Sequence, residues 1–158
     1  MRNLPRRHRE LSPLLGVPAR LDPWAILAGP YPTSDDARHL ADTGITLFVD
    51  LTEEGEGRSY AHVVKQHQRF PIIDHEIGTE EVVVAALDAI DAALADGGCV
   101  YVHCRWGCGR TGLVLACWLR RRGFPAEAAL GRIARLRGRD CPETTAQRRF
   151  VHGWRPGA

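Results

Sequence analysis

Lysine is nearly missing from this sequence of 158 residues, which has Lys65 as its one lysine beside 20 arginines. An excess of charge of one sign is also missing, because 21 basic residues stand against 19 acidic ones and the formal net charge is +2. Sequence-independent binding to nucleic acid needs a strongly basic surface. We therefore expect no nucleic-acid partner, and we attribute the preference for arginine to genome composition rather than to function.

Long apolar runs are lacking as well, and none approaches the roughly 18 residues of a membrane span. Arg6 and Arg7 are not followed by the apolar segment of an export signal, since Pro18 and Arg20 interrupt it. The five cysteines are an odd number, which favours free thiols in a reducing compartment. The sequence thus predicts a cytoplasmic protein without a membrane span.

The composition, 44% hydrophobic and 25% charged, is that of one globular domain and excludes a disordered or collagen-like chain. Residues 1–22 are rich in arginine and proline without apolar periodicity, so we interpret them as an N-terminal arm outside the core. Residues 23–158 form the single predicted domain.

Apolar runs alternate with helical periodicity from Trp24 onward. After an apolar run at 24–27, the pattern predicts strands at 45–51, 70–73 and 99–103, and helices at 34–44, 60–66, 79–97 and about 109–119, with two more that begin near Pro125 and Pro142. This alternation predicts an α/β fold with a largely parallel central sheet and helices on both faces. Ligands of such sheets bind beyond the carboxyl ends of the strands, where Asp50, Asp74 and Cys104 stand.

The turn after the strand at 99–103 contains four glycines or cysteines in six residues, and several motifs compete for it. Gly107-x-Gly109-x-x-Gly112 matches a dinucleotide fingerprint, but no acidic residue follows at the required distance and too little chain remains for a second nucleotide-binding half. A Walker A loop would need a lysine where Arg110 stands. A zinc site from Cys99, His103, Cys104 and Cys108 would lack a Cys-x2-Cys pair and would adjoin two arginines, so we expect no metal.

The remaining interpretation is a nucleophile loop that cradles phosphate, Cys-x5-Arg, running from Cys104 to Arg110. Cys99 and Arg105 have the same spacing, but Cys99 begins the apolar strand whereas Cys104 ends it. A thiolate among backbone amides at a helix N-terminus is stabilised and nucleophilic. Arg110 can bind two phosphoryl oxygens, and it can stabilise the negative charge that develops during transfer.

Further residues of this segment have expected roles. Thr111 can donate a hydrogen bond to the sulfur, and His103 can orient the loop from the strand side. The residues expected to bind phosphate are those of the loop itself: Arg105, Trp106, Gly107, Cys108, Gly109 and Arg110. This chemistry requires no metal and no cofactor.

Together, His103-Cys104-x5-Arg110-Thr111-Gly112 resembles the signature loop of the cysteine-dependent protein tyrosine phosphatase superfamily, and the chain is most similar to its small dual-specificity branch. The resemblance extends from about Trp24 to Phe150. It implies a cysteinyl-phosphate intermediate: Cys104 attacks phosphorus, a loop aspartate protonates the leaving oxygen, and water then releases phosphate.

The resemblance also implies a general acid upstream of the nucleophile and a glutamine that orients water. Asp74, after the apolar segment 70–73, is our choice of acid, with Asp50 and Glu76 as alternatives. The family often has a proline a few positions after the acid, where this chain has glycine and threonine. Gln147 takes the water-orienting role by resemblance only, and a solvated helix position is its alternative.

Two residues of the loop, Arg105 and Cys108, each allow two interpretations. The side chain of Arg105 either recognises a second acidic group of the substrate or is an ordinary exposed arginine. Cys108 either resolves an oxidised Cys104 through a disulfide or fills space as a small buried side chain.

The predicted function is hydrolysis of phosphomonoesters, chiefly phosphotyrosine with dual specificity for phosphoserine and phosphothreonine, so the partner is a phosphorylated protein or a small phosphomonoester. A phosphoinositide or inositol phosphate phosphatase is the enzymatic alternative. A non-catalytic phosphate-binding module on the same scaffold is the other alternative, although such a module would need no nucleophile.

Overall fold

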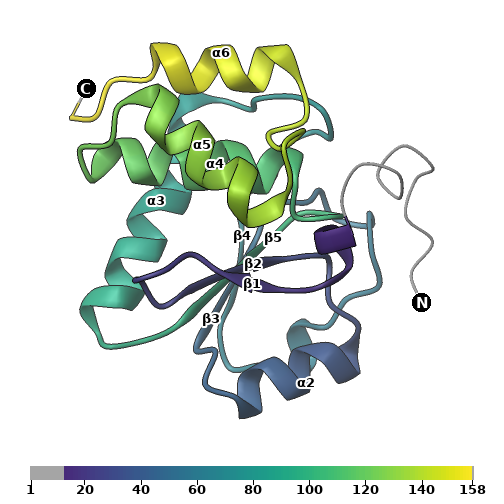
Figure 1. Ribbon diagram of the computed structural model, residues 1–158. Coiled ribbons are helices and arrows are strands. Elements are labelled where there is room, and N and C mark those ends of the chain that lie inside the picture. Colours follow the sequence, from purple (N-terminus) through teal and green to yellow (C-terminus); the bar gives the residue numbers. More distant parts are fainter. Residues whose placement is uncertain (1–12, 158) are drawn as a thin grey trace.

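A single twisted sheet organises the structure, a computed structural model that describes residues 13–157 (Figure 1). The strand order is β1-β2-β5-β3-β4, with bounds Ala19–Arg20, Ile26–Gly29, Val100–His103, Leu47–Asp50 and His67–Arg69 in that order. Strands β2, β5, β3 and β4 are parallel neighbours, whereas β1 pairs with β2 in the antiparallel sense. The predicted α/β fold with a largely parallel sheet is confirmed.

Helices cover both faces of this sheet, as predicted. Figure 1 shows on one side α3 (Glu80–Ala95), α4 (Gly109–Arg121), α5 (Ala126–Arg137) and α6 (Thr145–Gly153), and on the other side α2 (Ser34–Asp42). Alternate strand residues point to opposite faces. Val102 of β5 therefore belongs to the larger core on the α4 side, while Tyr101 belongs to the smaller core on the α2 side.

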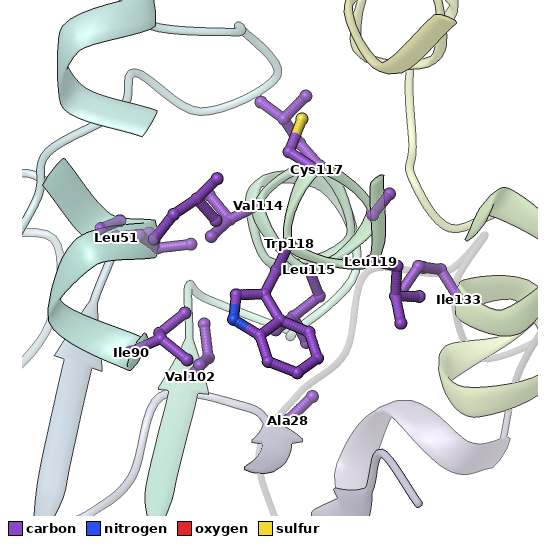
Figure 2. Close-up of a cluster of buried hydrophobic side chains, with 14 of the residues drawn as sticks. Ala28, Leu51, Ile90, Val102, Val114, Leu115, Cys117, Trp118, Leu119 and Ile133 are labelled. Carbon is purple, nitrogen blue, oxygen red and sulfur yellow. The ribbon is translucent and has the colours of Figure 1, made fainter. Parts of the chain in front are cut away.

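Helix α4 lies at the centre of the larger core, and its residues from Gly109 to Leu119 are all buried. Such a helix, apolar on several sides, is stable only when other elements surround it. Figure 2 shows Trp118 pointing toward the sheet between Ile90 of α3 and Ile133 of α5. The indole N–H donates to Asp91 Oδ1 at 2.8 Å. The sheet and its neighbouring helices thus fix the start of α4, where the site is built.

No helix within residues 13–157 is both long enough and apolar enough to span a bilayer.

Part of the predicted N-terminal arm belongs to the domain. Pro13–Gly16 form a 3-10 turn, η1, and β1 adds an edge strand to the sheet. Leu15 and Leu21 are 1% and 2% exposed and belong to the larger core. The expectation that the whole segment 1–22 lies outside the core was wrong for these residues, while residues 1–12 lie outside the described part of the chain.

Two of the predicted elements differ from the observed ones. The segment 70–73 is not a strand, because β4 comprises the more polar residues 67–69 instead. The helix expected at 60–66 is the short 3-10 helix η2 (Ala61–Val63). Thr33 caps α2 by accepting from the N–H of Asp36, and Thr79 caps α3 by accepting from the N–H of Val82.

Candidate active site

The segment from Cys104 to Arg110 lies at the carboxyl end of β5, the middle strand between β2 and β3. Cys104 follows the strand directly and is 4% exposed. The chain then turns back at Gly107, whose φ of +72° is a conformation that favours glycine. A Cβ there would lie 2.4 Å from the carbonyl oxygen of Gly29 on β2. The neighbouring strand and α4 therefore determine the shape of the loop.

Arg110, in the first turn of α4, is 1% exposed and is held by a carboxylate that the sequence analysis missed. Its Nη1 and Nη2 donate to the two oxygens of Glu56 at 2.7 and 2.9 Å, and Nη1 also donates to the carbonyl of Ile72 at 2.9 Å. Burial alone lowers the pKa of Arg110, but the bond to Glu56 and the charges of Cys104 and Asp74 raise it above its usual range. The guanidinium is thus a fixed cation.

The ion pair with Arg110 also affects the pKa of Glu56. Burial raises its pKa, but the hydrogen bonds from Arg110 and from the N–H of Glu53, together with the charges of Arg110 and Arg105, outweigh burial, so the pKa of Glu56 lies below its ordinary value. The loop that carries Glu56 follows β3, and β3 is the direct neighbour of β5. The signal for Glu56 in the sequence is an acidic residue between Gly55 and Gly57 in a loop beyond a buried strand.

Among the three carboxylates considered as general acid, Asp74 lies beside Arg110. Its Oδ1 is 3.4 Å from Arg110 Nη2, and its side chain is 44% exposed. Glu76 is exposed, and its backbone carbonyl, rather than its carboxylate, contacts Gln147. The structure therefore brings Asp74, Arg110 and Glu56 together at one end of the sheet.

Asp50 has a different environment from Asp74. It is fully buried, and its carboxylate accepts from the backbone and hydroxyl of Thr52, from His67 and from Arg69. Burial alone would raise its pKa, but the hydrogen bonds from His67 and Thr52 and the charge of His103 hold it well below the ordinary value. A carboxylate held ionised in this way does not release a proton near neutral pH, so the alternative assignment of Asp50 as the acid was wrong.

His103 connects this buried network to the loop. Its Nδ1 lies 3.0 Å from the carbonyl oxygen of Cys104, and its Nε2 contacts the hydroxyl of Tyr60. Burial raises the pKa of Tyr60 beyond its ordinary value, and the charge of Asp50 raises it further, so its hydroxyl keeps its proton. The ring of His103 is therefore fixed from both nitrogens, on the strand side of Cys104.

The hydroxyl of Thr111 and Nε of Arg110 are both buried, and neither has a hydrogen-bond partner among the described residues. The expected bond from Thr111 to the Cys104 sulfur is therefore not formed in this structure. Buried polar atoms seldom stay unpaired, and two of them at the first turn of α4 leave donors free where a ligand would bind.

Gln147 is fully buried at the N-terminus of α6, so the alternative of a solvated helix position was wrong. Its side-chain oxygen accepts from the N–H groups of Glu143 and Thr144, and its Nε2 donates to the carbonyl of Glu76. A Cβ added to Gly109 would lie 3.1 Å from this Nε2. The amide of Gln147 thus lies against the loop and connects it to the segment that carries Asp74.

Cys108 forms a disulfide with Cys141, 33 residues further on. The expectation that all five cysteines are free thiols was wrong for this pair, and Cys108 is joined to Cys141 rather than to Cys104. Cys99, Cys104 and Cys117 are free thiols. Cys141 lies in the middle of the connection from α5 to α6, so the disulfide fastens the loop to that connection.

The other predicted loop residues lie at the surface or at its edge. Arg105 is exposed and Trp106 is half-buried.

Next to Asp74, His75 has a φ of +68°, and its Nδ1 lies 2.6 Å from Glu143 Oε2. Asp74, His75 and Glu143 form the group of possible metal ligands in the described part of the chain, with atoms within 4.8 Å of one another. Their mutual contacts already account for this proximity.

A protein-family model described as "Polymorphic toxin system, DSP-PTPase phosphatase" matches residues 26–124, which is more than half of the chain and includes the segment from Cys104 to Arg110. The chain belongs to this DSP-PTPase family. The predicted resemblance to small dual-specificity phosphatases is confirmed at this level.

Two curated viral relatives of this DSP-PTPase chain agree with the family. The candidate tyrosine phosphatase 067L of Invertebrate iridescent virus 3 is 36% identical over 99 residues, which are 58% of this chain. The candidate tyrosine phosphatase 197R of Invertebrate iridescent virus 6 is 30% identical over 134 residues, which are 80% of this chain. The chain spans 40% and 49% of the lengths of these relatives.

Several solved structures share the fold of this chain. The G95A mutant form of Tk-PTP has a TM-score of 0.77 at 24% identity, with 87% of this chain and 93% of that chain covered. PTPMT1 in complex with PI(5)P has a TM-score of 0.74 at 22% identity, covering 85% and 92% of the two chains. Human DUSP28 has a TM-score of 0.67 at 23% identity, covering 85% and 92%. These likenesses support the fold.

Proposed function

We propose that this DSP-PTPase is a cysteine-dependent phosphatase that hydrolyses aryl phosphomonoesters such as phosphotyrosine, with dual specificity as a further property. The proposal rests on one observation: Asp74 Oδ1 lies 3.4 Å from Nη2 of Arg110, the residue that closes the loop begun by Cys104. A nucleophile, a fixed cation and a partly exposed carboxylate thus stand at one site. A module that only binds phosphate would need the cation and the loop amides, but neither the thiol nor the acid.

In the proposed mechanism, the phosphoryl group lies in the loop between Cys104 and Arg110. The thiolate of Cys104 attacks phosphorus, the bond from phosphorus to the ester oxygen breaks, and Asp74 gives its proton to the leaving oxygen. Asp74, now ionised, takes a proton from the water that attacks the cysteinyl phosphate, and the P–S bond breaks to release phosphate. Gln147 is the residue that we assign to orient this water, from its position against Gly109.

The free donors at the start of α4 fit this mechanism. Nε of Arg110 and the hydroxyl of Thr111 are buried without a partner among residues 13–157. A bound phosphoryl group supplies acceptor oxygens for such donors, and charge-assisted bonds of this kind strengthen as charge develops during transfer. When phosphate is bound, we expect the hydroxyl of Thr111 to donate a hydrogen bond to the sulfur of Cys104 or to a phosphoryl oxygen.

An exposed apolar side chain favours an aryl substrate. Ile73, directly before Asp74, is 51% exposed, one of two large hydrophobic side chains in the described part of the chain that are so exposed. An aromatic ring that carries the phosphate would cover part of this side chain, and burial of apolar surface contributes about 25 cal/mol per Å². The inositol ring of a phosphoinositide is polar and would gain less from this contact.

Phosphate release without added metal tests the proposal. Wild type, Cys104→Ser and Asp74→Asn are compared on an aryl phosphate, a phosphotyrosine peptide, a phosphoserine peptide and a phosphoinositide, each with a chelator present. We expect activity on the aryl substrates, loss of at least about 1000-fold in Cys104→Ser, and a 100-fold loss or so in Asp74→Asn. Equal activity in Cys104→Ser would contradict the mechanism. An inactive wild type that binds phosphopeptide would instead support the binding module.

The cytoplasmic location and the independence of metal remain predictions from the sequence. The chelator in the assay above tests the second. The disulfide between Cys108 and Cys141 bears on the first, because disulfides persist mainly in oxidising compartments. Fractionation of the cells that make the protein, with trapping of thiols at lysis, would locate it and report the state of this pair.

A further inference from the structure

The side chain of Arg137, the last residue of α5, lies behind the loop from Cys104 to Arg110 and has no part in the mechanism above. It is fully buried. Nε donates to the carbonyl of Gly107 at 2.9 Å, and Nη2 donates to the carbonyl of Trp106 at 3.1 Å. Two consecutive carbonyls of the loop are therefore bound to one guanidinium.

The other donors of Arg137 bind carbonyls outside the loop. Nη1 donates to Val17 at 2.6 Å and to Ala28 at 3.3 Å, and Nη2 donates also to Leu15 at 3.3 Å. A guanidinium has five N–H groups, and these five bonds use all of them. Arg137 thus connects the loop to β2 and to the segment that precedes β1.

Because of the geometry of the peptide bond, these contacts also determine where the loop N–H groups point. In a trans peptide the C=O and the N–H of the same unit point in opposite directions. The carbonyls of Trp106 and Gly107 point toward Arg137, so the N–H groups of Gly107 and Cys108 point away from it. These two N–H groups donate to no other group among the described residues. Amides that are oriented together and left unpaired bind anions.

The positive charge of Arg137 also favours an anion in the loop. Burial lowers its pKa, and attraction to Tyr101 and to the Cys104 thiolate opposes this effect. The guanidinium remains protonated, because an arginine does not lose its proton in proteins. A buried cation behind the loop therefore adds to the charge of Arg110 in front of it.

From these contacts we infer that Arg137 is a positioning residue: it holds the carbonyls of Trp106 and Gly107 so that the amides of Gly107 and Cys108 face the bound phosphoryl group. The inference rests on the proposed function, since it assigns the loop to phosphate. It predicts that Arg137 governs oxyanion binding without touching the substrate.

Substitutions at Arg137 separate its charge from its hydrogen bonds. Arg137→Met removes both, whereas Arg137→Lys keeps the charge and loses the five-donor pattern. Arg135→Met is the matched control, because Arg135 lies two residues earlier on α5 and is exposed. The readouts are the Kd for tungstate, KM and kcat on an aryl phosphate, and the rate at which iodoacetamide alkylates Cys104 at pH 6, all at a temperature where circular dichroism shows each variant folded.

We expect Arg137→Met to weaken tungstate binding and to raise KM about tenfold or more, with a smaller change in kcat. In Arg137→Lys, the rate of Cys104 alkylation should change less from its wild-type value than KM does, because the lysine retains the positive charge but loses the hydrogen-bond pattern of arginine. Arg135→Met should stay within about twofold of wild type in every readout. Wild-type values in Arg137→Lys and Arg137→Met would overturn the inference. A role confined to stability would lower the melting temperature but leave KM and the alkylation rate of the folded protein unchanged, which would also overturn it.

A measurement on the wild type covers the case in which the variants do not fold. The Nε–H resonance of Arg137 in nitrogen-15 spectra should shift when tungstate saturates the loop, while that of Arg135 should not. A wild type that binds tungstate without this shift contradicts the inference. If the wild type neither binds tungstate nor hydrolyses an aryl phosphate, the proposed function itself fails.

Discussion

Glu56 determines how the guanidinium of Arg110 faces a substrate, because its two carboxylate oxygens accept from both terminal nitrogens. A bidentate pair of this kind fixes the plane of the guanidinium. It leaves Nε of Arg110 unpaired among the described residues. One residue thus sets which face of the arginine is available to phosphate.

We therefore predict that Glu56→Gln lowers kcat/KM on an aryl phosphate about tenfold or more, because an uncharged amide does not hold both terminal nitrogens and the buried arginine loses its partner. Steady-state kinetics at constant ionic strength measures the effect. Glu54→Gln, in the same loop but exposed, is the control and should change kcat/KM less than twofold. A wild-type value for Glu56→Gln would show that other contacts suffice to orient Arg110.

The residues that the sequence predicts for the site are those whose proposed chemistry follows from one local segment. Cys104 and Arg110 share a turn between a strand and a helix, and Asp74 follows an apolar run. Glu56 and Arg137 reach the same loop from distant parts of the chain. Their roles depend on the strand order and on the path of α5, which cannot be read from the local periodicity of a single sequence.

At the scale of elements, the connection from α5 to α6 is fastened to the loop by the disulfide between Cys108 and Cys141. A cross-link that closes a loop of 33 residues is expected to stabilise the fold by about 3–4 kcal/mol, mainly because it restricts the unfolded chain. The sequence contained both cysteines, but one sequence does not say which of five cysteines are paired.

We predict that Cys141→Ser lowers the free energy of unfolding by about 3 kcal/mol, and that a reductant lowers the stability of wild type by a similar amount. Urea denaturation with and without a dithiol measures both. Denatured wild type should show three thiols before reduction, corresponding to Cys99, Cys104 and Cys117. Cys99→Ser is the control, since Cys99 is half-buried and free. Five thiols in unreduced protein and equal stability in both conditions would contradict the prediction.

Strand β4 shows why one element was misplaced. The apolar residues 70–73 suggested a buried strand, but the strand is formed by 67–69, which pair with β3. Beyond Phe70 the chain is no longer a strand, although the N–H of Ile72 still donates to the carbonyl of Leu51. The carbonyl of Ile72 reaches Arg110, and Asp74 follows beside it. The apolar character of Phe70 and Ile72 reflects packing in the larger core rather than pairing within a strand.

At the scale of the whole molecule, the predicted order of strands and helices was enough to place the site at the carboxyl edge of a parallel sheet. That edge also contains Asp50, which connects β3, β4 and β5 through His67, Arg69 and the region of His103. The fold and the site therefore share one buried network, and its state of ionisation affects the stability of the entire sheet.

The pH dependence of stability tests this network. The folded pKa of Asp50 lies below its ordinary value of 3.8, so its contribution is complete above that value and is lost as the pH falls through the lower folded pKa. We expect Asp50→Asn to be less stable than wild type at pH 7, and the difference in unfolding free energy to shrink by about 2 kcal/mol at pH 2.5. Urea denaturation of both proteins at the two pH values measures it. Thr52→Val removes one hydrogen bond to the carboxylate and should reduce this pH dependence in part, whereas a difference that stays constant with pH would mean that Asp50 does not stabilise the fold as an ionised group.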